Sequence, residues 1–263
     1  MNFDGLTKKF EKMGASVSFN EGMARNGISV NIINRKFQIT VDDESQLDIS
    51  IPDVQKDDRH LLMFVKSPDL RPGVKEPPQR YLCGHDERDW FVAAVPESSG
   101  ASNVREAREA LKPRSIREAQ KGKLKTKDLN KGRNEVFTRQ GEWFFTPVNI
   151  KEPEDYEIHK KEEIRRGGGS PHVVEEIYRR GGTTAYACSK YPDGVTQEKY
   201  NEIIKRDNGS IQDWKSYTVD AAVFGRGWVR HRDHKTINLP GWHRIEMNTE
   251  NQAMAMRNVT FLD

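Results

Sequence analysis

Apolar and polar residues alternate along much of this chain, and this alternation is the strongest constraint on its fold. Apolar residues occupy every second position of residues 28–32 and again of 37–41, with the polar segment Asn34-Arg35-Lys36 between the two runs. Successive side chains of a strand point to opposite faces of its sheet, so this pattern predicts a β-hairpin with one buried face. Further strands or hairpins are predicted for 47–51, 61–65, 80–95, 136–146, 183–188 and the C-terminal stretch 217–262.

Helices are predicted where capping residues frame an apolar stripe. The segments run from Asp4 to Gly14, Asn103 to Pro113, Ser115 to Gly122, Ser170 to Gly182 and Thr196 to Gly209. The start signal is strongest at Ser170, because a serine at the N-cap is followed by a proline at the first helical position. Residues 151–166 before it are interpreted as a charged linker. These elements predict an α+β fold of antiparallel β-rich sheets and hairpins with three or four peripheral helices.

A proline-rich run suggests how the chain is divided. Prolines cannot donate a hydrogen bond to a ladder, so residues 67–79, with four prolines, are interpreted as an exposed connection. We expect a small N-terminal helix and β-hairpin subdomain at 1–66 and an α+β main domain at 80–263. The longest apolar run is far shorter than the roughly 20 residues of a membrane span. Two cysteines are too few for a disulfide framework, so we expect a cytoplasmic protein with no membrane partner.

Charge is distributed unevenly along the chain. Residues 41–60 hold seven acidic residues against two basic ones, whereas residues 105–134 hold eleven basic residues against four acidic ones. An excess of cations on one segment favours an anionic partner. A second candidate anion site is the run Arg165 to Ser170, because the N-terminus of the helix expected there would present free N–H groups to a phosphate.

The segment from Phe224 to Met247 concentrates residues that can bind metals. It holds three of the seven histidines, His231, His234 and His243, and neutral imidazoles suit zinc or another divalent transition metal. In an extended strand, His231 and His234 would point to opposite faces, so a joint site requires a turn near Asp233. A hairpin at Pro240-Gly241 could then return His243 to the other two. In this hypothesis Asp233 or Glu246 would orient a catalytic water.

Basic and aromatic residues alternate in the same segment, which is typical of a surface that stacks on bases and neutralises phosphates. The alternative interpretation is that its tryptophans belong to the core. Together with the basic segment, the predicted nucleic-acid contacts are Lys121, Lys123, Lys125, Lys127, Arg165, Arg166, Arg226, Trp228, Arg230, Arg232, Trp242 and Arg244.

Three classes of function follow from these features. The preferred hypothesis is an intracellular nucleic-acid-binding protein, with RNA or DNA as its partner. The second is a metal-dependent hydrolase or nuclease that uses the histidines. The third is a protein-interaction scaffold that recruits partners through the acidic 41–60 and basic 105–134 segments.

Overall fold

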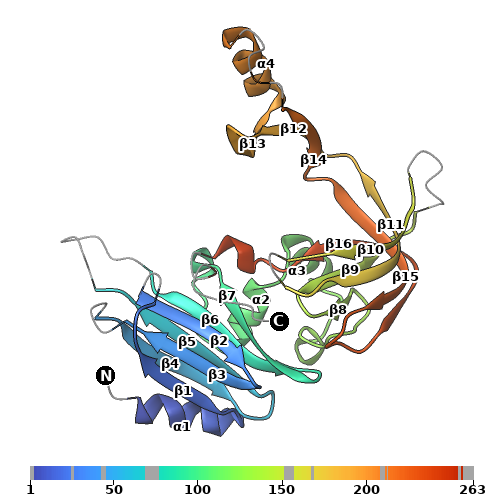
Figure 1. Cartoon of the computed structure of the whole chain (residues 1–263). Coiled ribbons are helices and arrows are strands. Elements are labelled where there is room, and N and C mark those ends of the chain that lie inside the picture. The colour runs from blue at the N-terminus through green and yellow to red at the C-terminus, as the bar shows by residue number, and fades with distance from the viewer. Residues whose placement is uncertain are drawn as a thin grey trace.

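The computed structural model describes residues 3–24, 27–42, 46–68, 77–150, 157–166, 169–207, 211, 213–253 and 256. It has four α-helices and sheets whose strands are mostly antiparallel, which confirms the predicted α+β class (Figure 1). Within the described ranges, no helix is both long and apolar enough to cross a membrane.

The N-terminal half consists of one helix and two sheets around a common core. Helix α1 (Asp4–Met13) ends at Gly14, whose left-handed conformation closes the last turn, and it buries Phe10 and Met13. A three-stranded sheet has the order β1-β3-β2, and a four-stranded sheet has the order β4-β5-β6-β7. The strands are β1 (Val17–Glu21), β2 (Ile28–Ile33), β3 (Lys36–Val41), β4 (Asp48–Gln55), β5 (His60–Lys66), β6 (Gln79–Asp86) and β7 (Asp89–Val95).

The four-stranded sheet is buried on both faces, which explains its nearly continuous apolar runs. Leu61 and Tyr81 face the N-terminal core with α1, whereas Leu62 and Leu82 face helix α2 (Val104–Ala110). The predicted connection at 67–79 therefore falls between β5 and β6, two hydrogen-bonded neighbours in one sheet. Most of that connection, residues 69–76, lies outside the described residues.

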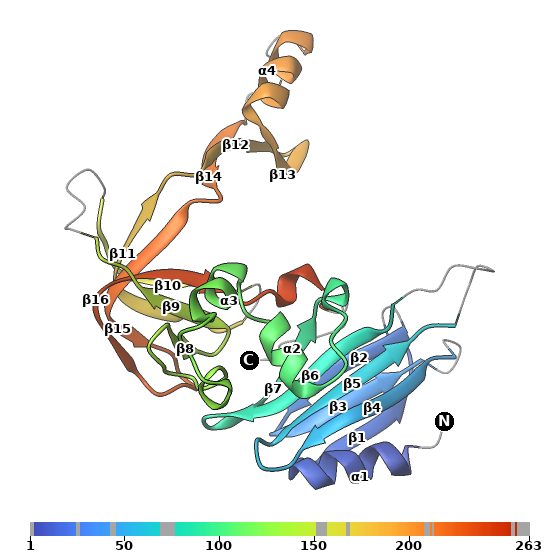
Figure 2. The same cartoon turned by 180° about the vertical axis from the view of Figure 1, so that it is seen from behind.

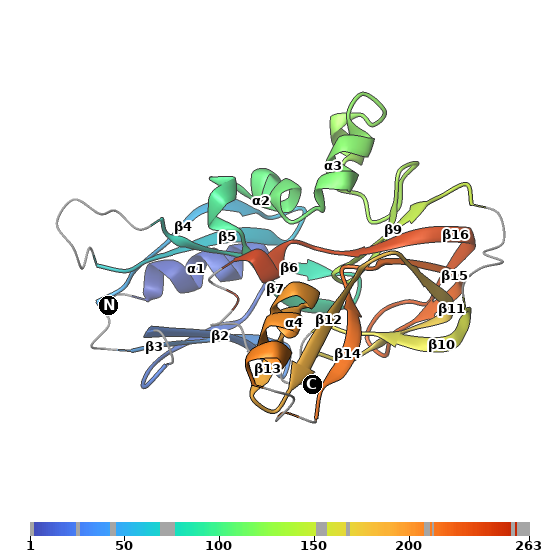
Figure 3. The same cartoon turned by 90° about the horizontal axis from the view of Figure 1, so that it is seen from above.

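A six-stranded sheet forms the C-terminal half and lies beside the N-terminal sheets when the molecule is seen from above (Figure 3). Its strand order is β10-β11-β15-β16-β9-β8. The strands are β8 (Thr138–Gln140), β9 (Trp143–Pro147), β10 (His159–Ile164), β11 (His172–Arg180), β15 (Ala222–Arg230) and β16 (Ile237–Met247). Helix α3 (Arg114–Gln120) and the 3-10 turn η4 (Thr126–Asp128) complete this half, whereas the 3-10 turns η3 (Glu97–Ser99) and η5 (Glu250–Gln252) contact β6 and β7 of the N-terminal sheet.

The helix predicted from Ser170 is wrong, because residues 172–180 form strand β11. Its β-branched residues Val173, Val174 and Ile177 favour a strand, and β11 pairs on both sides, with β10 and with β15. A bulge between Val174 and Glu176 shifts the alternation, so that the spacing of buried residues resembles a helical stripe. The charged linker is likewise corrected in part, since His159–Ile164 is strand β10.

A small subdomain is inserted between β11 and β15 and projects away from the rest of the molecule (Figures 1 and 2). It contains β12 (Thr183–Cys188), β13 (Tyr191–Thr196), α4 (Gln197–Arg206) and β14 (Lys215–Val219), with the strand order β13-β12-β14. The Thr196 hydroxyl accepts a hydrogen bond from the Lys199 N–H, which confirms the predicted cap of α4. The predicted C-terminal meander is confirmed only for β15 and β16, because β14 pairs with β12.

A pair of substitutions tests the burial pattern of β11. Ile177→Ala should lower the free energy of unfolding by about 2–5 kcal/mol, because Ile177 is fully buried in the core of the six-stranded sheet. Val173→Ala should cost clearly less, since the Val173 side chain is only partly buried. Urea denaturation of both variants measures the difference. Equal destabilisation at the two positions would contradict the strand register.

Candidate functional site

A cavity of about 490 Å³ lies between the N-terminal sheets and the six-stranded sheet. Apolar side chains such as Leu82, Phe91 and Phe144 line one part of it, and ionisable side chains line another. The ionisable set comes from both halves of the chain and includes His60, Asp86, Arg108, Lys112, Arg139, Glu142, Arg166, His231, Asp233, His234 and Glu250.

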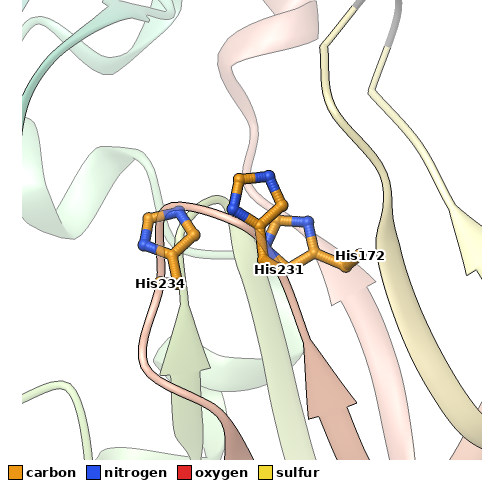
Figure 4. Close-up of side chains that lie close together, drawn as sticks. All are labelled: His172, His231 and His234. Atoms are coloured by element: carbon orange, nitrogen blue, oxygen red, sulfur yellow. The ribbon is translucent and has the colours of Figure 1, made fainter.

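Three histidines form a cluster beside this cavity, and two of them, His231 and His234, line it. One ring nitrogen from each of His172, His231 and His234 lies within 4.8 Å of the other two. The His172 and His231 ring centroids are 4.2 Å apart, and those of His231 and His234 are 4.7 Å apart. Figure 4 shows the three rings grouped together, with His172 on a different segment from the other two. Among the described residues, these are the only histidines, cysteines or acidic residues that form such a group.

Strand pairing explains how His172 reaches His231. Val173 lies opposite Arg230 in the antiparallel β11–β15 pair, so the next pair of positions along the ladder is His172 and His231. Side chains at directly opposite positions of such a pair are close neighbours. Strand β15 ends at Arg230, and the chain then turns through 231–236. This turn near Asp233 brings His234 to the same side as His231, as a joint site requires.

Burial makes His172 unusual. Its side chain is 1% exposed, and neither of its ring nitrogens has a hydrogen-bond partner among the described residues. Burial lowers the pKa of His172 to about 2, with smaller contributions from His231, His234 and Arg166. A buried polar group without a partner costs about 1–3 kcal/mol, so two such nitrogens on one buried ring call for a partner such as an ion or an ordered water.

Gly141 leaves the space beside these nitrogens open. It occupies the turn between β8 and β9 with a φ of +57°. A β-carbon there would lie 2.9 Å from Nε2 of His234 and 3.4 Å from Nε2 of His172. The Nε2 atoms of both rings therefore face the same glycine, and the missing side chain leaves room for a small ion.

Carboxylates lie close to two of the three imidazoles. Nδ1 of His231 lies 4.0 Å from Asp233, and Nδ1 of His234 lies 3.9 Å from Glu87. Glu142 follows Gly141 and lines the cavity, and its carboxylate has no hydrogen-bond or ion-pair partner within the described part of the chain. Glu250 is fully buried, forms an ion pair with Arg166 and has its pKa raised by burial.

The structure places His243 and Glu246 away from the cluster, which corrects the predicted hairpin. Pro240 and Gly241 lie within β16, where a bulge opposite Gly225–Gly227 accommodates the proline without ending the strand. His243 is 3% exposed and contacts the Gly241 carbonyl oxygen through Nδ1 at 2.9 Å. Glu246 accepts a hydrogen bond from the Ser115 hydroxyl at 2.7 Å. His172 takes the position that the sequence pattern assigned to His243.

The predicted basic and aromatic face is largely internal or neutralised. Trp242 is 5% exposed and packs against Tyr178, with the Arg226 guanidinium 4.6 Å from its ring centroid. Arg230 stacks on Trp228 at 4.3 Å. The ion pairs in this set are Arg226–Glu176, Arg232–Asp233, Arg244–Glu246, Arg165–Glu163 and Arg166–Glu250. Because β11 replaces the expected helix, the predicted helix N-terminal anion site at 165–170 is also wrong, and Gly167 and Gly168 lie outside the described residues.

The predicted lysines have a different environment. Lys121, Lys123, Lys125 and Lys127 lie between α3 and β8, and all four are exposed. None of them forms an ion pair with another described residue. Their positive charge is available to a partner.

Comparison of the chain with protein-family models, with curated proteins and with solved structures finds no match in any of the three. The properties of the site therefore come from its own residues. The sequence pattern missed His172, Gly141, Glu142 and Glu87. The alternation of His172 with Val174, next to β-branched neighbours, was the available signal for His172.

Acid should destabilise the metal-free protein through His172. Its pKa is about 2 in the folded protein and 6.5 in the unfolded chain, so the unfolded chain binds the extra proton below pH 6.5. Above pH 6.5, His172 is neutral in both states and does not lower the free energy of unfolding. Below pH 6.5, proton uptake by the unfolded chain lowers the free energy of unfolding by about 1.4 kcal/mol per pH unit. Urea denaturation with EDTA at several pH values should give a shallower slope for His172→Gln. Equal slopes would show that His172 is protonated in the folded protein.

Proposed function

We propose that this protein is a metal-dependent hydrolase whose ion is held by His172, His231 and His234. The observation that carries the proposal is the buried His172 ring, whose two nitrogens lack partners among the described residues at the point where two other imidazoles converge. Ordinary buried histidines satisfy at least one nitrogen, so a ligand at this point explains the arrangement.

The donor set, three imidazole nitrogens, suits a divalent transition metal. Three nitrogens bound at about 2.0–2.1 Å to one Zn²⁺ lie about 3.0–3.5 Å from one another. The present upper separation of 4.8 Å is larger, and the rings are stacked with interplanar angles of 23–33°, so metal binding would require them to move by about 1 Å and to turn their in-plane lone pairs toward one ion. When bound by three histidines, such an ion keeps an open position and lowers the pKa of a water there to about 7.

Glu142 is the carboxylate best placed to accept a proton from that water. It lines the cavity, its carboxylate forms no hydrogen bond or ion pair with another described residue, and its charge acts on both His234 and Arg139. Asp233 also lines the cavity, but Arg232 lies 3.2 Å from its carboxylate. The apolar wall at Leu82, Phe91 and Phe144 would hold a nonpolar part of the substrate and exclude bulk water.

Two histidine variants test the metal site. Purified protein should carry about one metal ion per chain, and His172→Gln should lose most of it because one of three ligands is removed. His243→Gln should keep the metal, since His243 is buried but lies outside the cluster. Elemental analysis and hydrolysis of a panel of ester and phosphodiester substrates measure both effects. Full metal content in His172→Gln would contradict the proposal.

Two glycine variants test whether metal loss can be separated from general destabilisation of the fold. Gly141→Ala and Gly100→Ala both place alanine at positive φ, +57° and +63°, so their backbone strain should be similar. Only the alanine at position 141 meets the histidines, because nothing lies within 4 Å of a β-carbon at position 100. Metal should be lost from Gly141→Ala alone. Equal metal loss in both would point to general destabilisation.

Nucleic-acid binding is a second candidate, favoured by the four exposed lysines at 121–127. Exposed lysines without ion pairs can neutralise phosphates at little cost in broken interactions. They lie in a segment with an excess of seven positive charges, which also includes Lys112 and Arg108. Trp242 is buried and cannot stack on a base, whereas exposed Arg230 and half-buried Trp228 remain accessible in addition to the lysines.

Salt dependence tests the second candidate. Replacing Lys121, Lys123, Lys125 and Lys127 by alanine should weaken binding of an oligonucleotide. It should also reduce the slope of log K against log salt by about 0.9 for each phosphate that is no longer neutralised. The matched control replaces Lys8, Lys12, Lys36 and Lys66, which are exposed elsewhere and give the same change in net charge. Fluorescence anisotropy measures both slopes. Identical slopes in the two quadruple variants would remove residues 121–127 from the interface.

A further inference from the structure

We infer that Glu87, at the tip of the β6–β7 hairpin, is a positioning residue that holds His234 for metal binding and links the site to the N-terminal sheet. This inference rests on the proposed metal site. It concerns a carboxylate from the N-terminal half that reaches histidines of the C-terminal half.

The backbone N–H and the backbone carbonyl of Lys235 both form hydrogen bonds with side chains. The Lys235 N–H donates to Oε2 of Glu87 at 2.9 Å, and the Lys235 carbonyl accepts from Nε2 of Gln140 at 2.7 Å. Gln140 is fully buried, so its amide is a fixed donor. Lys235, the residue after His234, is therefore hydrogen-bonded both to the β6–β7 hairpin of the N-terminal sheet and to strand β8 of the six-stranded sheet. This restricts where the His234 ring can lie.

The same Glu87 oxygen also faces the ring itself. Oε2 lies 3.9 Å from Nδ1 of His234, whereas Nε2 of His234 faces Gly141 beside Nε2 of His172. The two ring nitrogens thus have separate environments, one toward a carboxylate and one toward the cluster. A carboxylate near the outer nitrogen favours the tautomer with a proton on Nδ1, which leaves the Nε2 lone pair for the ion.

The hairpin tip makes a second contact with the site. Asp86, next to Glu87, forms an ion pair with Arg139, and Arg139 lies two residues before Gly141. Glu87 itself has a φ of +47°, a left-handed conformation that is uncommon outside glycine, asparagine and aspartate. The tip therefore contacts two elements beside the cluster, the turn at 231–236 and strand β8, which leads into the turn at Gly141.

A coupling between metal binding and sheet packing follows from these contacts. If Glu87 holds His234 in place, its removal must weaken metal binding. By the same linkage, metal binding must strengthen the packing of the β6–β7 hairpin against the six-stranded sheet. Removal of a carboxylate that orients a metal-bound histidine typically lowers metal affinity about 10–100-fold.

Three variants of the full chain test the role of Glu87. Glu87→Ala removes both interactions, and Glu87→Gln keeps an oxygen acceptor for the Lys235 N–H but removes the charge. Asp89→Asn is the control on the same hairpin, because it removes a carboxylate that pairs with exposed Arg35 and is not part of the histidine cluster. Zinc affinity is measured by chelator competition, the visible absorption of bound cobalt reports the ligand geometry, and urea denaturation with EDTA reports the fold.

We expect zinc affinity to fall about 10–100-fold in Glu87→Ala, with a smaller decrease in Glu87→Gln and an altered cobalt spectrum in both. Asp89→Asn should stay within about twofold of the wild type, since exposed ion pairs contribute little. Affinities and spectra of both Glu87 variants equal to those of Asp89→Asn would overturn the inference while leaving the metal site in place. A wild-type protein that binds no zinc or cobalt would instead overturn the proposed function, and this inference with it.

Discussion

The pairing of β11 with β15 is the interaction on which the histidine cluster depends. Val174, Ile177 and Val229 are fully buried along this ladder, so apolar burial holds the two strands in one register. A shift by one residue would turn His172 to the opposite face and away from His231. The cluster therefore lies at the end of a ladder that is fixed by the core, and its first two imidazoles need no flexible loop to meet. Sites built on regular strands are more accurately positioned than sites built on loops.

The loop that carries His234 is held in a different way. It has no apolar side chain buried in the core, and polar contacts from Glu87 and Gln140 hold its backbone instead. Polar contacts of this kind contribute about 0.5–3 kcal/mol each, much less than the core beneath His172. In the proposed metal site, His234 would consequently be the ligand most easily displaced, because it lies in the segment held by the weakest contacts. Displacement of one ligand is the means by which a three-histidine site could exchange its ion.

Local sequence patterns correctly predicted the elements that depend on neighbouring residues. They failed where the pairing of strands distant in sequence determines the structure. The hairpin at 28–41, helix α1 and the cap of α4 depend on neighbouring residues, and all three are confirmed. Ser170-Pro171 gave an equally strong local signal for a helix, but the neighbours β10 and β15 outweigh it. The predicted helix gave no reason to place His172 beside His231, because only the pairing of β11 with β15 brings these two positions together. His243 was chosen in its place because it is close in sequence, whereas strand register brings His172 close in space.

The cations of the molecule belong to two populations with different consequences. Around the cavity, Arg139 and Arg166 are paired with Asp86 and Glu250, so they fix the geometry of the site and add little net field. The lysines at 121–127 are exposed and without ion pairs among the described residues, so they attract anions from a distance. Salt screens exposed charges over about 8 Å at physiological ionic strength but acts weakly on buried contacts. Raising the salt concentration would therefore weaken an association through the lysines while leaving the histidine cluster intact, which makes the two proposed activities separable in one sample.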